Sequence, residues 1–203
     1  MSPLPADQLQ IRLVSTPSGA LTDAHFAASR GPIPELRDGE VLVKNLLLSI
    51  DAANRAWMFG ATYRAAVSPG DVMHGGTVSV VVDSRAPGFS AGDVVSGMGG
   101  WQEYAAVDPA TLQKCTAHRP LTHQLSVYGV AGLTAYHGLV HVAGVSAGET
   151  VVVSAAAGSV GSLVGQIAKQ KGARAIGIAG GADKCDWVVR ELGFDACIDY
   201  KSA

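Results

Sequence analysis

The residues best suited to chemistry form a small-residue turn between two apolar stretches. Residues 151–153 are an uninterrupted valine run, and residues 160–168 place apolar side chains at helical spacing. The first N–H groups of a helix have no partner inside it, and small residues let an anion approach them. Strand, tight turn and helix in this order predict the opening of a dinucleotide-binding βαβ unit. We expect its pyrophosphate to lie against Gly158, Ser159, Val160 and Gly161.

The glycine motif of this turn is incomplete. Gly-x-Gly-x-x-Gly would put glycines at 156, 158 and 161, and position 156 is Ala. Gly158 should let the phosphates approach the backbone, and Gly161 should let helix and strand pack closely. We expect Gly165 to extend that close contact.

The choice of cofactor depends on the residues that follow the next strand. NAD enzymes carry an Asp or Glu about twenty residues beyond the glycine motif, on the adenosine ribose. Residues 178–184 read Ile-Ala-Gly-Gly-Ala-Asp-Lys, so two glycines stand where a carboxylate would be expected. Lys184, in the first turn of a helix, is unfavourable there unless an anion lies nearby, and a 2′-phosphate would be that anion. This pattern favours NADPH, with a merely solvated Lys184 and a ribose-binding Asp183 as alternatives.

No ligand set for a metal ion emerges from the sequence. The three cysteines are separated by 70 and 12 positions, whereas structural zinc needs four close ligands. His137 and His141 have the spacing of a zinc-binding helix, but Gly138 stands where that motif has Glu. Cys115, His118 and His123 form a loose cluster without a fourth ligand. We therefore expect no metal.

Composition excludes several classes of partner. Of the 203 residues 48% are hydrophobic and 16% charged, which is typical of a globular protein. The net charge is −2 and no basic block occurs, which argues against nucleic acid and anionic membranes as partners. The first residues lack a signal peptide's basic and apolar regions, and no apolar run is long enough to span a bilayer. Widely spaced cysteines suit reduced thiols, so we expect a cytoplasmic protein.

These elements predict two domains of different class. Residues 1–125 show short strands with Gly and Pro between them, as in a partly closed β-barrel. Residues 126–203 start with a helical segment and continue as an incomplete Rossmann domain. Its later helix should start after an N-cap Asp183 and run through Leu192, with Gly193 terminating it. The expected strands are 9–14, 41–50, 77–83, 94–95, 102–107, 151–153, 173–178 and 196–199, with 31–34 as a loop.

Only three parallel strands can be found in the second domain, where a doubly wound dinucleotide domain usually has about six. The sequence therefore looks cut in mid-domain. We expect the 203-residue chain alone to be inactive, and either to self-associate or to survive only beside its own severed remainder.

Several motifs in one order give the chain a family resemblance. They are Leu-Ser-Ile-Asp at 48–51, Val-Ser-Gly-Met at 95–98, Gly-Leu-Thr-Ala-Tyr at 132–136, Ala-Ala-Ala-Gly-Ser-Val-Gly at 155–161, and Ile-Asp-Tyr-Lys at 198–201. The chain resembles the zinc-independent medium-chain dehydrogenase/reductase superfamily, and within it the leukotriene B4 dehydrogenase / prostaglandin reductase group of NADPH-dependent alkenal double-bond reductases. Ala52, Asn54 and Ala131 depart from the residues common in that group, which bears on the substrate pocket more than on cofactor binding.

The resemblance implies a GroES-like first domain and a Rossmann second domain, and we expect the complete protein to be a homodimer. It also implies that Lys184 and Tyr200 approach the 2′-phosphate and that Thr134 lies near the nicotinamide. The implied reaction is hydride transfer to the β-carbon of an α,β-unsaturated ketone or aldehyde. A quinone reductase of the same superfamily and a non-catalytic nucleotide-binding protein are the alternatives.

The enolate formed in such a reaction needs a hydrogen-bond donor and a proton. In the family a tyrosine beyond residue 203 is implicated. Tyr63 and Tyr104 are candidates without further support, because a tyrosine in a β-domain more often packs in the core. The catalytic acid is left unassigned.

Overall fold

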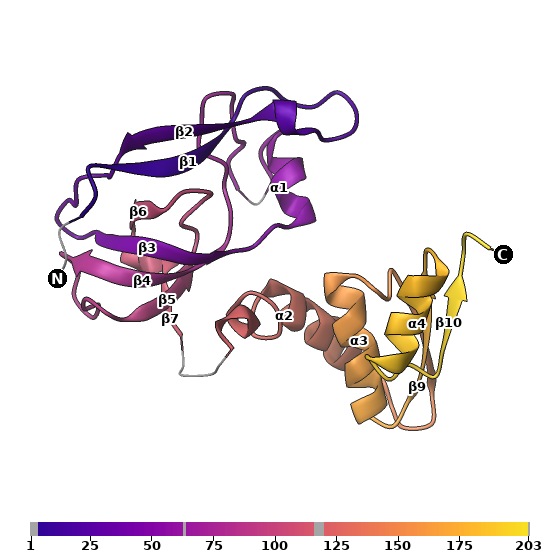
Figure 1. Ribbon diagram of the computed structural model, residues 1–203. Coiled ribbons are helices and arrows are strands. Elements are labelled where there is room, and N and C mark those ends of the chain that lie inside the picture. Colours follow the sequence, from indigo (N-terminus) through magenta and orange to yellow (C-terminus); the bar gives the residue numbers. More distant parts are fainter. Residues whose placement is uncertain (1–3, 63, 116–119, 203) are drawn as a thin grey trace. The chain divides into compact units, whose positions relative to one another are not determined.

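The computed structural model describes residues 4–62, 64–115 and 120–202. The chain divides into two compact units, Met1–Leu125 and Ser126–Ala203. Figure 1 shows strands dominating the first unit, and helices beside a small sheet in the second. No described helix is long and apolar enough to cross a membrane.

The first unit is built on an antiparallel sheet in the order β6-β3-β4-β5-β7. Alternate residues of its strands, such as Val41, Val43, Val81 and Val95, are buried in one core, as the period of a half-buried strand requires. The strands are β3 (Val41–Leu48), β4 (Thr77–Ser84), β5 (Val94–Gly97), β6 (Tyr104–Val107) and β7 (Gln113–Lys114).

A separate hairpin, β1 (Asp7–Leu13) with β2 (Phe26–Pro32), accompanies this sheet. The expectation of a loop over 31–34 is wrong for Gly31 and Pro32, which end β2. Strand β2 contains no β-branched residue, so its intrinsic β-propensity is low. Its pairing with β1 therefore makes it a strand. Pro32 is tolerated because it terminates a strand whose other edge is unpaired among the described residues.

A buried amide joins the hairpin to the sheet. Gln8 is fully buried; its Oε1 accepts from the Tyr104 N–H at 2.7 Å, and its Nε2 donates to the Pro32 carbonyl at 3.2 Å. A second amide, Asn45, donates to the Gly100 and Gln102 carbonyls at 3.2 and 2.7 Å. These side chains satisfy backbone groups that no strand pairing reaches.

The first unit also has short helices that the sequence pattern did not predict. One is α1 (Ala52–Trp57), whose N-cap Asp51 and N3 residue Asn54 form a capping box. Six residues are too few to show a helical period, so the pattern could not reveal it. The single-turn helices are η1 (Asp23–His25), η2 (Pro109–Thr111) and η3 (Leu121–Gln124).

The second unit contains a parallel sheet in the order β10-β9-β8. Its strands, β8 (Thr150–Ser154), β9 (Arg174–Ala179) and β10 (Ala196–Asp199), confirm the three predicted from the sequence. The crossover helices α3 (Ser159–Gln170) and α4 (Ala182–Arg190) cover one face of the sheet (Figure 1), because both connections run the same way along the strand order. The predicted helix over 126–142 is α2 (Val130–Tyr136) followed by a π-helix, η4 (His137–Val142).

The two faces of this sheet differ. Val153, Ala175 and Val188 are buried in the core between sheet and helices. On the opposite face Val152 is 60% exposed and Ile198 48% exposed. Val152 is exposed because its face of the sheet has no cover among the described residues. The antiparallel unit followed by a parallel βαβαβ unit nevertheless confirms the predicted fold class.

Candidate cofactor site

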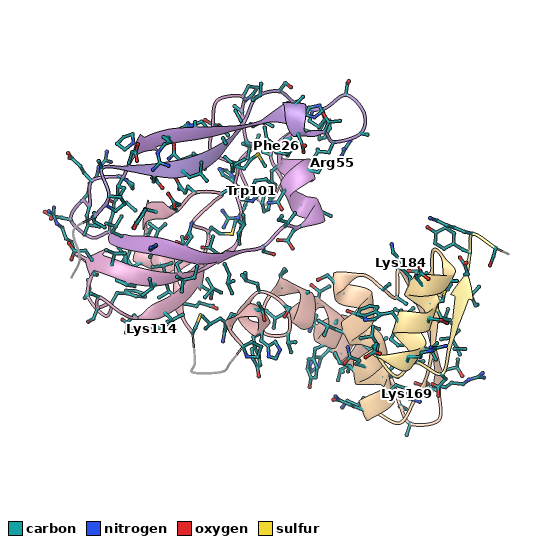
Figure 2. All side chains as sticks on the ribbon, in the orientation of Figure 1. Phe26, Arg55, Trp101, Lys114, Lys169 and Lys184 are labelled. Carbon is teal, nitrogen blue, oxygen red and sulfur yellow. The ribbon has the colours of Figure 1, made fainter. Side chains whose placement is uncertain are left out.

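The candidate residues for cofactor binding gather where the parallel strands end. Strands β8, β9 and β10 finish at Ser154, Ala179 and Asp199, and parallel strands place their carboxyl ends at one edge of the sheet. Figure 2 shows Lys184 at this end of α4 and Lys169 at the far end of the unit.

The turn from β8 to α3 is tight and closely packed. Ala155 has a φ of 49°, the only positive value of a non-glycine residue in the described chain. The Ala156 N–H donates to the Ile178 carbonyl at 3.1 Å, which ties the turn to β9. A side chain at Gly161 would strike the Ala155 carbonyl. Gly161 thus lets α3 approach the turn itself, which gives a physical reason for the predicted glycine.

Ala156, which stands where the motif has its first glycine, packs against strand β9. Ala156 is fully buried, and a Cβ at Gly177 on β9 would lie 2.9 Å from the Ala156 Cβ. The Ala156 methyl therefore occupies space that Gly177 leaves open. An alanine is therefore tolerated at position 156 because the neighbouring strand has a glycine, Gly177, opposite it.

Gly165 has a different role from the one expected. A side chain there would collide with the ring of Phe194, which follows α4 and is buried in the core. Gly165 therefore accommodates an aromatic ring from a distant segment, and this ring makes the nearest contact with the position.

The start of α3 offers free backbone donors. Its N-cap, Gly158, has no side chain to cap the helix, and the first N–H to bond back is that of Ser162, to the Gly158 carbonyl at 2.9 Å. In the described chain, the N–H groups of Ser159, Val160 and Gly161 have no backbone acceptor. Three free donors at a helix N-terminus suit a phosphate.

At the turn from β9 to α4, the predicted N-cap of the helix, Asp183, is wrong. The N-cap of α4 is Gly181, with a φ of 103°, and Asp183 lies in the first turn. A residue with a side chain would be strained at that φ, so glycine takes the cap position. Lys184 lies in the same turn and is exposed. The helix ends at Arg190, before the predicted Leu192, because Gly193 has left-handed geometry.

Asp199 organises this second turn, and the motif analysis gave it no role. Its Oδ1 accepts from the Gly181 N–H at 2.8 Å and from the Lys201 N–H at 3.0 Å. These two backbone donors lower the pKa of the carboxyl. Strand register could have revealed the role, since Asp199 is the partner of Ala179 and so lies beside the turn after β9.

Tyr200 lies against the same turn. Its N–H donates to the Ala179 carbonyl at 3.2 Å, and a Cβ at Gly180 would lie 2.8 Å from its hydroxyl oxygen. Gly180 therefore leaves the space that the phenol occupies. The hydroxyl that the resemblance assigns to a 2′-phosphate lies beside the turn that begins the helix of Lys184.

Thr134 lies away from these turns in the sequence. It is exposed on α2, a helix packed against α3. With Leu133, His137 and Gly138 it lines an open, mostly apolar pocket of about 510 Å³. Its position near a nicotinamide stays a prediction.

The described residues that were considered for metal binding form no group of three ligands. Among the described residues no group of three His, Cys, Asp or Glu side chains could hold a metal ion. The rings of His137 and His141 lie 5.3 Å apart, without a third ligand of these kinds. Burial raises the pKa of the Cys115 thiol, and His118 lies outside the described residues.

The tyrosine candidates for a proton donor gain no support. Tyr63 lies outside the described residues. Tyr104 is 6% exposed, and the Lys44 ammonium lies 5.8 Å from the centre of its ring. A side chain enclosed in this way fits a packing role.

Comparison with known proteins shows which family has this architecture. Residues 9–115 match the N-terminal domain of an oxidoreductase family. The NADPH-dependent curcumin reductase of Escherichia coli is 42% identical over 190 residues, or 93% of the chain, and prostaglandin reductase 1 of Bos taurus is 40% identical over 188 residues, or 91%. The crystal structure of CurA from Vibrio vulnificus in complex with NADPH is 42% identical, with a TM-score of 0.89 over 96% of the chain.

The chain spans 55% of the length of each of these two relatives and 58% of the CurA chain. The matched domain itself covers more than half of the present chain. The chain therefore belongs to the zinc-independent medium-chain dehydrogenase/reductase superfamily of oxidoreductases, in the group that includes the prostaglandin reductases.

Proposed function

We propose that the protein reduces the C=C bond of α,β-unsaturated ketones or aldehydes with NADPH. The observation that carries this proposal is the pair of turns at one sheet edge, one with three free N–H donors and the other with an exposed lysine. The names of the curcumin reductase and of the 2-alkenal reductase of Nicotiana tabacum support the substrate class.

The two turns would hold opposite ends of the adenosine half of the cofactor. The N–H groups of Ser159, Val160 and Gly161 would donate to the pyrophosphate, where Gly158 leaves the backbone open. Lys184 and Tyr200 would bind the 2′-phosphate. Gly161 fits this role because any larger residue would push α3 from the turn.

The carboxylate beside the second turn is already engaged by backbone donors. The Oδ1 atom of Asp199 accepts from the backbone N–H groups of Gly181 and Lys201. A ribose 2′-hydroxyl would find no carboxylate at Gly180 or Gly181, whereas a phosphate would find an ammonium group nearby. Asp183 stays the rival ribose acceptor, since it is exposed in the same helical turn.

When bound, NADPH would supply the hydride for the β-carbon of the substrate. The chain's own residues would hold the cofactor and fix its orientation, which converts a bimolecular reaction into a positioned one. Thr134 would lie on the nicotinamide side, next to the apolar pocket on α2 and η4.

The test is Lys184→Ala in the intact protein. Loss of one charge-assisted hydrogen bond should weaken NADPH binding by about 1.5–3 kcal/mol and leave NADH binding nearly unchanged. Lys169→Ala is the matched control, because Lys169 pairs with Asp195 on another part of the unit. Calorimetric titration with both cofactors measures the difference, and equal losses for NADPH and NADH would refute the assignment.

The substrate class has its own measurement. Turnover of a set of enones and enals should exceed turnover of quinones, and the reverse order would favour a quinone reductase. Cofactor binding without turnover of either would favour a non-catalytic nucleotide-binding protein. Metal independence, a homodimer and a cytoplasmic location stay predictions.

A further inference from the structure

Two cysteines from different elements face each other beneath α4. Cys197 on β10 is the register partner of Gly177 on β9. A Cβ at Gly177 would lie 3.2 Å from the Cys197 Sγ and 3.0 Å from a Val188 methyl carbon. The Cys197 thiol therefore lies over the empty position of Gly177, on the face of the sheet that α4 covers.

Cys185 approaches the same place from the helix. It stands three residues before Val188, and residues three apart share one face of a helix. Val188 is fully buried against the sheet, so the Cys185 side chain also points toward the strands. Both cysteines are half-buried, which leaves them within reach of small reagents.

The surroundings of the Cys197 thiol include the thiol of Cys185. Burial and a hydrogen bond with the Cys185 thiol raise the pKa of Cys197 to about 12. Cys197 is therefore a protonated thiol at neutral pH, and we assign it to the second step of the exchange.

We propose that Cys185 and Cys197 form a dithiol site that closes to an intramolecular disulfide by exchange with a low-molecular-weight disulfide such as oxidised glutathione. This site lies outside the proposed reduction chemistry and does not depend on it.

The exchange proceeds in two balanced steps. The Cys185 thiolate attacks one sulfur of oxidised glutathione, which forms a mixed disulfide and releases one glutathione thiolate. Cys197 then loses its proton to solvent and attacks the Cys185 sulfur, which releases the second glutathione. Two protein thiols are oxidised and one glutathione disulfide is reduced to two thiols. Once Cys185 is in the mixed disulfide, its thiol no longer raises the pKa of Cys197, which helps the second step.

The disulfide would join two segments of the candidate site. Cys185 follows Lys184, and Cys197 precedes Asp199 by two residues. Closing the bond would fix the first turn of α4 to the strand that leads to Tyr200. Oxidation would therefore stabilise the second unit against unfolding by constraining the unfolded chain.

The experiment treats the natively folded 203-residue chain with oxidised glutathione and maps the product by peptide mass spectrometry. We expect loss of two hydrogen atoms, one cross-linked peptide pair containing Cys185 and Cys197, and a Cys115 thiol that stays reduced. The Cys115→Ser variant should close equally well. In Cys197→Ser the mixed disulfide on Cys185 should persist. The same treatment of the chain unfolded in guanidinium serves as the reference. In that reference, disulfides between Cys115 and the other two cysteines should also appear.

The wild-type chain alone can overturn the proposal. Glutathione on Cys185 and Cys197 of the same molecule, or no modification at all, would refute it. A native product with the same pairings as the unfolded reference would also refute it. Circular dichroism of each variant before treatment shows whether a changed product reflects lost chemistry or lost folding.

Discussion

The two units of the chain exclude water from their interiors by different means. In the first unit, side-chain amides from distant positions hydrogen-bond to backbone groups, as Gln8 does with Tyr104 and Pro32. In the second unit, glycines leave space into which another segment fits, as Gly165 does for Phe194. Glycines also leave such space in the first unit, as Gly97 does for Leu112, so the feature that sets the first unit apart is its buried side-chain amides.

Each of these two kinds of packing predicts a sensitivity to a different kind of substitution. A shape-matched change that removes polarity should damage the first unit, because it leaves buried backbone groups unpaired. A change that adds one methyl group should damage the second, because close-packed interiors have no room for it. The predictions below test this contrast in order of decreasing effect.

The largest effect should come from Gly165→Ala. The new methyl collides with the Phe194 ring, so the free energy of unfolding of the second unit should fall by about 3 kcal/mol, the upper end for overpacking. Gly138→Ala is the control, since nothing lies within 4 Å of a Cβ at that position. Urea unfolding with hydrogen exchange resolved by unit measures both. If the two variants have the same free energy of unfolding, the Phe194 ring does not pack tightly against Gly165.

A smaller effect should follow from Gln8→Met in the first unit. Methionine has nearly the shape of glutamine but cannot accept from the Tyr104 N–H, so unfolding should become easier by about 2 kcal/mol. Gln113→Met, at an exposed position of β7, is the control. Thermal and urea unfolding give the comparison. A stable Gln8→Met chain would show that packing, not polarity, holds the hairpin to the sheet.

The smallest effect should be one of pH on the second unit. The Asp195 carboxylate accepts from Lys169 at 2.7 Å and from the Ala175 N–H at 2.7 Å, and these bonds lower its pKa. A lowered pKa gives stability that is present above the ordinary aspartate value of about 3.9 and is lost as pH falls through the lowered value.

Urea midpoints measured between neutral and strongly acidic pH test this effect. The midpoint of the second unit should fall in the acid range, and Asp195→Asn should flatten that part of the curve. Asp186→Asn, on the exposed side of α4, is the control. An unchanged acid slope in Asp195→Asn would show that other groups carry the effect.

The contrast also explains what the sequence could reveal. The βαβ unit follows from local patterns, because strand, turn and helix are consecutive in residues 150–170. The partner of Gly165 is 29 positions away and the partner of Gln8 is 96 positions away, so neither could be predicted from spacing. Strand β2 was missed for the same reason, since its pairing with β1 defines it. Asp199 lay within a recognised motif, but its bond to Gly181 depends on strand register.

The left-handed conformation of Ala155 has a consequence for how the turn is maintained. A non-glycine residue at positive φ is strained by about 1 kcal/mol, whereas alanine samples fewer unfolded conformations than glycine would. Strain in the folded chain and reduced freedom in the unfolded chain act in opposite directions and are similar in size. Replacing Ala155 by glycine should therefore change stability little. It would, however, widen the range of geometries open to the turn, so the alanine keeps the anion-binding amides in one arrangement before any ligand arrives.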